Sequence, residues 1–463
     1  MTATLPLPTP YVTVPPLTDW SRVVAFRPDF YGAPASEAEL RAMIAAHLAK
    51  PAPRGSLRFL GGLHSCSDTF VGDSVIDCSQ LPQTLVWDAD NGAVVASGNW
   101  HLHDFLLAVA AKGKSLTATG GTDAQTLAGL IATNTAGATA TTSIYELVDW
   151  IDFLTIAHDG VTLVDRRITA GTPEFDAAIC SLGALGYLLR VRFRLVDELF
   201  FAASQTLVSL ESVLADPFAT TAKHPFWRIE WLPTSFPQRG LFWTCDPIPR
   251  ELADPDGDYP IDGDESILSQ AIGFTDKFLH AGALMDHALA AAYEVLVLTF
   301  TPVTATGPLR TMLPVDRLSP LAVAQAEWAF DPADIMAAIA AIKAYCATAG
   351  WPNLPIEIEL TRTDSYYMSS WNWPGLAAVA KFNFQYLTDY LTAAEQAAML
   401  VHLEGLWDHL VASGLRFKGH WGKLNFMTTA MVAKNYDTAA FVPFVQPAFV
   451  NDYLRGRIPG LPV

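Results

Sequence analysis

The chain has 463 residues, of which 51% are hydrophobic and 16% are charged. This length is too great for one average domain, and this composition excludes a disordered chain, so we expect two or three units with large buried cores. Its 47 acidic and 29 basic side chains give a net charge of −18, which disfavours nucleic acid and anionic lipid surfaces as partners.

The five cysteines are odd in number, lie far apart and form no Cys-x-x-Cys pair. They predict neither a disulfide scaffold nor a metal site, and they favour a reducing, cytoplasmic location. The first residues carry no basic segment and are interrupted by prolines, so we expect no signal peptide. No uninterrupted apolar run of about 18 residues occurs, which argues against a membrane span.

The first part of the chain predicts an α+β unit. A helix is expected over residues 37–50, because Ser36 supplies an N-cap in front of an amphipathic pattern. Further helical patterns cover residues 103–112 and 126–133. The expected strands, bounded by Gly, Asp and Asn, are 57–60, 75–78, 93–96, 151–156, 162–164 and 187–195.

The middle of the chain predicts a second α+β unit. Between residues 199 and 224 the pattern drifts and no element is predicted, whereas residues 247–264, rich in Pro, Asp and Gly, predict a surface loop. The expected helices are 270–298, 332–348 and 393–413, and the expected strands are 227–232, 241–244 and 355–361.

Two glycine-rich segments are candidates for anion binding. Residues 58–68 form a strand that runs into Gly-Gly and then a cluster of hydroxyls around one histidine; glycines let backbone N–H groups approach a pyrophosphate closely. In residues 119–137, small residues at helical spacing leave room for a flat ligand, and the helix start near Gln125 offers free amides. A structural turn and tight helix packing are the alternatives. Neither segment has the dinucleotide fingerprint or a Walker loop.

Four motifs carry a resemblance to a known family. The spacings Gly-Gly-x-His-Ser-x-Ser-Asp at 61–68 and Asp-x-Gln-Thr-x-Ala-Gly-x-Ile-Ala-Thr at 123–133 resemble the vanillyl-alcohol-oxidase-type flavoproteins, and most of all their aldonolactone oxidase and alditol oxidase branch. Residues 181–186 are similar to the loop that closes the FAD domain there, and His-Trp-Gly-Lys at 420–423 is similar to its C-terminal signature.

The resemblance implies an α+β fold with a PCMH-type FAD-binding domain, made of two α/β subdomains, and an inserted α+β substrate cap. The expected boundaries are 1–200 for the FAD-binding domain, 201–414 for the cap and 415–463 for a C-terminal segment that returns to the FAD-binding domain.

The resemblance also implies the cofactor site, in which His64 is bonded covalently to FAD. Cys66 is expected to serve packing, and Ala136 stands where relatives often carry a histidine, which makes the pocket more apolar. The other residues expected around FAD are Gly61, Gly62, Ser65, Ser67, Gly121, Thr122, Gln125, Thr126, Gly129, Thr133, Gly137 and His420, with Gly183 and Gly186 behind it.

On the substrate side, Glu357 and Glu359 project to one face of a predicted strand, and Glu359 occupies the position of a substrate-binding arginine in the relatives. Two carboxylates without a nearby cation would raise the pKa of one of them and poise a general base; an exposed acidic strand face is the alternative. Arg362 is expected on the opposite face. Lys423 is implied as a cation beside the flavin's pyrimidine edge, or else it is a surface lysine next to Trp421.

Two further features have open interpretations. The aromatic run at 366–373 either walls a pocket or packs an edge of the second unit. The pair Glu327-Trp328 resembles a Glu-aromatic pair at the start of a strand in the relatives, without an assigned role.

The expected function is therefore FAD-dependent oxidation of the CH–OH group of a polyol, sugar or aldonolactone to a carbonyl, with dioxygen as acceptor and hydrogen peroxide as product. One alternative is a dehydrogenase or oxidase that acts on a hydrophobic alcohol or biosynthetic intermediate and uses another acceptor. A non-catalytic flavin-binding protein is a second alternative, which the intact motifs disfavour.

Overall fold

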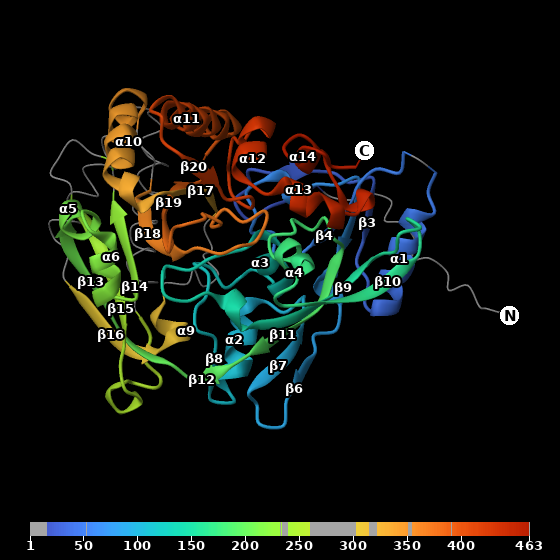
Figure 1. Ribbon diagram of the computed structural model, residues 1–463, viewed down its shortest axis with the longest axis horizontal. Helices are drawn as coiled ribbons and strands as arrows, with labels where there is room; N and C mark the ends of the chain where they lie inside the picture. Colours follow the sequence, from blue (N-terminus) through green and yellow to red (C-terminus); the bar gives the residue numbers. More distant parts are fainter. Residues whose placement is uncertain are drawn as a thin grey trace.

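The computed structural model describes residues 16–51, 53–231, 233, 239–259, 302–313, 322–350, 354–389 and 391–462. Two units lie side by side in it (Figure 1). The N-terminal unit, residues 16–197, contains the small sheets, and the large-sheet unit, residues 200–419, contains a single sheet of eight strands. The predicted α+β class is confirmed.

The N-terminal unit begins with a three-stranded parallel sheet in the order β3-β5-β4. Helix α1 packs on it because Leu40 and Ile44 bury themselves against Leu57 and Ile76. The hydroxyl of Ser36 accepts a hydrogen bond from the Glu39 N–H, as the predicted N-cap requires. The bounds are β1 Leu17–Thr18, β2 Ala25–Phe26, β3 Phe30–Gly32, α1 Glu37–Leu48, β4 Leu57–Leu60 and β5 Ser74–Asp77.

An antiparallel sheet of five strands, in the order β10-β9-β11-β7-β6, completes this unit. Its apolar residues share one core with helices α2 and α3, which follow its strands in sequence. The bounds are β6 Leu85–Trp87, β7 Ala93–Ser97, α2 Leu102–Ala110, β8 Lys114–Ser115, α3 Leu127–Thr133, β9 Val148–Ile156, β10 Leu163–Thr169, α4 Pro173–Ala178, β11 Tyr187–Arg194 and β12 Val196–Asp197.

The large sheet is antiparallel throughout, in the order β16-β13-β15-β14-β18-β19-β17-β20. Its strands are β13 Phe200–Ser209, β14 Phe226–Trp231, β15 Arg239–Pro247, β16 Val303–Pro308, β17 Val323–Phe330, β18 Ile356–Arg362, β19 Ala378–Leu387 and β20 Phe417–Gly419. Among its described residues, the helices of this unit are α5 Leu210–Leu214, α6 Pro217–Lys223, α9 Leu309–Met312, α10 Ile335–Ala349 and α11 Ala393–Ala412.

The two faces of the large sheet differ in polarity around β17, β18 and β19. On the face covered by α10 and α11 (Figure 1), Trp328 packs against Trp407 of α11 with ring centroids 5.1 Å apart. Phe382 packs against its neighbour Phe330 on the same face, with ring centroids 5.0 Å apart. Because side chains alternate along a strand, the residues in between project to the other face, toward the N-terminal unit. That second face carries the charged side chains of the candidate active site.

The C-terminal segment returns to the N-terminal unit after β20. The guanidinium of Arg58 on β4 donates to the carbonyl of Phe449 at 2.5 Å, and the Asn451 amide donates to the carbonyl of Val71 at 2.7 Å. The Cys66 N–H donates to the carbonyl of Gly422 at 2.8 Å. The helices of this segment are α12 Thr429–Asn435, α13 Thr438–Phe441 and α14 Asp452–Arg455.

Most predicted elements in the described residues coincide with observed ones, but five strands of the large sheet, β13, β16, β17, β19 and β20, were not predicted. The short strands β1, β2, β3, β6, β8 and β12 were not predicted either. The drift at 199–224 contains β13 and two short helices. Residues 248–259 form no strand or α-helix, in agreement with the predicted loop, although residue 247 still belongs to β15. Residues 260–264 and the predicted helix 270–298 lie outside the described residues. All five cysteines are described, and each is a buried free thiol. In the described part of the chain, no helix combines the length and apolar character needed to span a bilayer.

Candidate active site

The two glycine-rich segments meet, as their predicted common function requires. A side chain at Gly61 would collide with the Thr126 hydroxyl, and one at Gly62 would lie 2.6 Å from the carbonyl oxygen of Ala124. Larger residues at 61 and 62 would push the loops apart, so glycine is required by this approach. At Gly121, in contrast, an added Cβ would meet no described atom within 4 Å, so this backbone is open to a ligand.

Several predicted cofactor side chains are already engaged within the loops. Ser67 donates to the carbonyl of Trp421 at 2.6 Å, and Thr133 donates to the carbonyl of Gly129 at 3.0 Å. The Thr126 hydroxyl caps the N-terminus of α3 by accepting from the Gly129 N–H. These hydrogen bonds stabilise the loops and occupy the polar side-chain atoms. The surface that remains available to a cofactor therefore consists mainly of backbone groups.

The Gln125 amide is internal to the second segment. It donates to the carbonyl of Thr122 at 3.0 Å and accepts from the Thr135 hydroxyl at 2.9 Å. The side chain therefore holds the start of the segment against its end. Ser65 lies next to Gly422 of the C-terminal motif, whose added Cβ would be 3.3 Å from the serine hydroxyl.

The three remaining predicted glycines are interior. Gly137 packs directly on the backbone of Thr119, Gly183 faces the guanidinium of Arg58, and Gly186 lies against the backbone of Leu154. Gly183 and Gly186 have φ values of +69° and +135°, which favour glycine for conformational reasons.

His64 lies at the edge of the first loop, half-buried, with its ring 4.9 Å from that of Trp20. Burial, followed by the positive charges of Lys423 and His101, lowers the pKa of His64 to about 4. The imidazole is therefore neutral at pH 7, which is the nucleophilic form that a covalent bond to a flavin would need.

His420 is 3% exposed, and neither ring nitrogen has a hydrogen-bond partner at normal distance among the described residues. Burial lowers its pKa to about 4, although Glu327 and a backbone contact with Thr133 oppose this shift. Trp371 stacks on the ring with centroids 5.6 Å apart. A buried imidazole with two open nitrogens is suited to a polar ligand, because leaving it unpaired costs free energy.

The predicted pair of carboxylates is neither exposed nor without cations. Glu359 is 7% exposed and pairs with Lys381 at 2.5 Å. Glu357 pairs with Arg228 at 2.5 Å and accepts from the Asn383 amide at 2.7 Å. Both ideas, an acidic pair without a nearby cation and an exposed acidic strand face, are wrong because β14 and β19 flank β18 and supply the partners.

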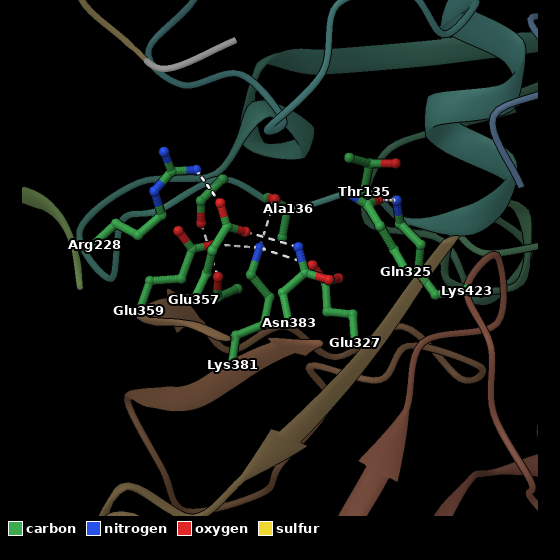
Figure 2. Close-up of polar contacts among 12 residues, drawn as sticks. Thr135, Ala136, Arg228, Gln325, Glu327, Glu357, Glu359, Lys381, Asn383 and Lys423 are labelled. Atoms are coloured by element: carbon green, nitrogen blue, oxygen red, sulfur yellow. Dashed lines mark hydrogen bonds and ion pairs between the residues drawn. The ribbon is translucent and has the colours of Figure 1, made fainter. Parts of the chain in front are cut away.

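These side chains form what we call the carboxylate cluster. Figure 2 shows Lys381 in its middle, with Glu357 and Glu359 on one side and Glu327 on the other. Glu327 lies 3.4 Å from the Lys381 ammonium, which also donates to the carbonyl of Ala136 at 3.0 Å. The cluster consists of Arg228, Glu327, Glu357, Glu359, Lys381 and Asn383.

The carboxyl groups of the cluster differ in pKa. Burial raises the pKa of Glu359, and Glu357 adds to the rise, although the charge of Lys381 opposes it. Burial also works against the charge of Glu327, but Lys381, His420 and Lys423 outweigh it and lower the pKa of Glu327. Of Glu359 and Glu327, Glu359 is therefore the carboxyl whose surroundings raise its pKa and make it the better proton acceptor.

Lys423 and Glu327 lie where the large-sheet unit meets the C-terminal motif. The Lys423 ammonium donates to the side-chain oxygen of Gln325 on β17 and is half-buried rather than free on the surface (Figure 2). Trp421 is fully buried. Glu327 lies in the middle of β17, not at the start of a strand.

Two tryptophans of the aromatic run are buried at the contact between units. Trp371 donates from its indole N–H to the carbonyl of Asn134 at 2.8 Å, and Trp373 packs beside it with Val379. Trp371 also lines a small pocket together with Ala136 and other residues of the 134–137 loop. The run therefore serves both purposes left open by the sequence, since it walls a pocket and packs an edge. Arg362 lies at the end of β18 and pairs with Glu146 at 2.7 Å.

Three residues of the cluster, Arg228, Lys381 and Asn383, were not predicted from the sequence. A signal for the last two was present: residues 381–386, Lys-Phe-Asn-Phe-Gln-Tyr, alternate polar and aromatic side chains with the period of a strand. Their position beside Glu357 and Glu359 depends on strand pairing, which that alternation does not specify.

The residues present fit a flat, anionic cofactor. The backbone at Gly121 is open, the ring nitrogens of the buried His420 have no hydrogen-bond partner among the described residues, and the charge of Lys423 is close enough to His420 to lower its pKa. Amide N–H groups, an imidazole and a cation are suitable partners for phosphate oxygens and an electron-rich ring.

Comparison with known protein families identifies the N-terminal unit. The family described as "FAD binding domain" matches residues 28–164. The N-terminal unit is an FAD-binding domain. This FAD-binding domain contains both glycine-rich loops and His64, and the predicted resemblance to PCMH-type flavoproteins is confirmed.

Curated relatives of this chain include an alcohol oxidase and a lactone oxidase. A long-chain alcohol oxidase from an uncultured marine euryarchaeote is 31% identical over 175 residues, which cover 37% of this chain and 35% of the relative. D-Arabinono-1,4-lactone oxidase from Yarrowia lipolytica is 24% identical over 243 residues, covering 51% of this chain and 44% of the relative. The matches thus span less than half the length of these relatives.

Solved structures match over nearly the whole chain. A cholesterol oxidase variant from Brevibacterium sterolicum superposes with a TM-score of 0.74 at 14% identity, covering 98% of this chain and 100% of that one. A solvent-stable cholesterol oxidase gives a TM-score of 0.72 at 16% identity, with coverages of 95% and 97%. At this identity the likeness concerns the fold alone, and it extends over both units of this chain.

Proposed function

We propose that this protein is an FAD-dependent oxidoreductase that oxidises the CH–OH group of a small alcohol, such as a polyol, sugar or aldonolactone, to a carbonyl. The observation that carries the proposal is Glu359, a buried carboxyl with a raised pKa, on a sheet face that contacts a loop of an FAD-binding domain. The relatives with matching sequence are oxidases of alcohols and lactones by name.

The two loops would hold FAD through backbone amides near Gly121, with His420 and Lys423 beside the ring. FAD, when bound, supplies the acceptor for the hydride that leaves the carbinol carbon. Lys423 provides positive charge where reduction of a ring adds negative charge. Trp371 and Trp373 exclude water from the contact between the units.

The carboxylate cluster would handle the proton. Glu359 accepts the proton of the substrate hydroxyl, since its raised pKa brings it closer to neutral pH than an ordinary carboxyl. Glu357 is held by Arg228 and Asn383, so it is suited to orienting the hydroxyl rather than to accepting its proton. Lone pairs of both carboxylates favour a substrate that donates hydrogen bonds.

We also propose that His64 forms a covalent bond to FAD, which its neutral imidazole at the edge of the first loop permits. Acid precipitation tests this, because a bonded flavin stays with the pellet and absorbs near 450 nm. We expect His64→Ala to fold, to release its FAD into the supernatant and to turn over more slowly. Undiminished flavin in the pellet of this variant would contradict the assignment.

Dioxygen is the proposed electron acceptor, with hydrogen peroxide as the product. Anaerobic mixing with a panel of polyols, lactones and lipophilic alcohols should bleach the yellow colour, and admission of air should restore it with one peroxide formed per carbonyl. Bleaching without peroxide would favour the dehydrogenase alternative. A protein that no alcohol bleaches would refute the proposed activity.

A further inference from the structure

The proposed reaction assigns no role to Lys381, although this lysine is 3% exposed and lies at the centre of the cluster. It belongs to β19, between β18 and β17. Burial of a cation is costly unless partners compensate it, so a lysine at this depth requires a specific set of contacts.

The contacts of Lys381 join three separate segments. Its ammonium contacts Glu359 of β18 at 2.5 Å, Glu327 of β17 at 3.4 Å and the carbonyl of Ala136 at 3.0 Å. An ammonium has three donors, and these three acceptors use them all. Ala136 belongs to the FAD-binding domain, so one side chain links the proposed base to the domain that binds the cofactor.

Other charged groups around Glu359 are committed elsewhere. Arg228 of β14 pairs with Glu357 at 2.5 Å and with Glu230 at 3.0 Å, and Lys423 donates to Gln325. His420, which faces the cluster from the C-terminal segment, is neutral at pH 7 because burial lowers its pKa. Lys381 forms an ion pair with Glu359 at 2.5 Å, and the charge of Arg228 adds to the lowering effect on the Glu359 pKa.

Lys381 keeps its charge through the working range of pH. Burial disfavours the ammonium, but Glu327 and Glu359 outweigh this and raise the pKa of Lys381 above its usual value. Its positive charge is thus constant, while the protonation of Glu359 varies.

We propose that Lys381 is a positioning residue that sets the pH at which Glu359 becomes a base and fixes its carboxylate against the Ala136 loop. This inference rests on the proposed function, in which Glu359 accepts the substrate proton. An opposite charge at contact distance lowers the pKa of a carboxyl by about 1 to 3 units. Removal of the lysine charge should raise the pKa of Glu359 by a similar amount.

The first test is the pH dependence of kcat for Lys381→Gln, which keeps a donor for the Ala136 carbonyl but removes the charge. The acidic limb of the profile should move by about 1 to 3 pH units toward alkaline pH. In Lys381→Arg, which keeps a positive charge, the limb should lie close to its position in the unmodified protein. Lys418→Met is the matched control, since Lys418 is 2% exposed and donates to the carbonyl of Asn372 at 2.5 Å. An acidic limb that stays in place in Lys381→Gln would overturn the proposal.

The second test needs no turnover. Infrared titration of the substrate-free protein should show a carboxyl that stays protonated to higher pH in Lys381→Gln than in the unmodified protein, and the double variant with Glu359→Gln should lose this signal. If no alcohol is oxidised but this signal appears, the proposed function fails while the role of Lys381 stands. If alcohol is oxidised and neither the limb nor the signal moves, the inference alone fails.

Discussion

At the scale of single residues, Glu357 and Glu359 have the same chemistry and the same strand face, but different surroundings. Glu357 accepts from a guanidinium and an amide, whereas Glu359 has a lysine on one oxygen and a more deeply buried side chain, 9% exposed against 14% for Glu357. Burial raises the pKa of Glu359 despite that lysine, because transfer of a charge out of water outweighs one contact. The environment thus separates an orienting carboxylate from a basic one.

Glu359→Gln tests this separation. It should lower kcat by about 10²- to 10⁴-fold, the usual contribution of a general base, while flavin binding persists. In the unmodified protein, activity requires the ionised carboxylate, so it should rise with pH through a pKa above the ordinary value for glutamate. Steady-state rates between pH 4 and pH 9 measure both effects.

Glu230→Gln is the matched control for that experiment, because Glu230 lies on β14, one strand further from Lys381, and contacts Arg228. Its rate and pH profile should stay close to those of the unmodified protein. A loss in Glu230→Gln as large as that in Glu359→Gln would mean that the charge of the whole face matters, not one base.

At the scale of elements, helix α11 holds the apolar face of the large sheet and begins with a capping box. Thr392 accepts from the Glu395 N–H at 3.3 Å, and the Glu395 carboxylate accepts from the Thr392 N–H at 2.7 Å. Two free N–H groups of the first turn are satisfied in this way. Downstream, Trp407 of the same helix packs on Trp328 of β17, so the cap supports the strand that carries Glu327.

Thr392→Ala should therefore destabilise the protein by about 1 kcal/mol, seen as a lower midpoint of thermal unfolding followed by circular dichroism. Thr392→Ser keeps the hydroxyl and should leave the midpoint nearly unchanged. Equal losses in both variants would show that the methyl group, not the cap, is what stabilises the helix.

At the scale of the whole molecule, Arg58 joins segments that are far apart in sequence. Its guanidinium donates to the carbonyls of Thr69, Leu182 and Phe449, and burial lowers its pKa to about 10. Among the described residues it has no carboxylate partner, so it acts through these carbonyls. One side chain thus closes the FAD-binding domain around its C-terminal segment.

Arg58→Met should leave the buried carbonyls of Leu182 and Phe449 without their donor, at a cost of about 1 to 3 kcal/mol each, while the carbonyl of Thr69 keeps the Asn451 amide at 3.4 Å. Thermal unfolding should begin at lower temperature, and limited proteolysis should cut the C-terminal segment first. Arg41→Met, which removes an exposed pair with Asp165, should cost less than about 1 kcal/mol. Equal sensitivity of the two variants would refute the role of Arg58.

Local sequence patterns determined much of this protein. The Ser36 cap, the helices at 332–348 and 393–413, the strands at 227–232 and 355–361 and the two glycine-rich loops were all predicted, because caps, periodicity and glycine act over a few residues. The family of the N-terminal unit followed from its motifs for the same reason.

The tertiary structure alone decided what surrounds the carboxylates. Glu359 meets Lys381 because β18 pairs with β19, and Lys381 meets Ala136 because the large sheet packs on a loop about 245 residues earlier in the chain. Such pairings depend on register and on the burial of an apolar face by α10 and α11, which are properties of the assembled core. Desolvation likewise exists only after folding, so sequence could identify the acids but not their cations or the direction of their pKa shifts.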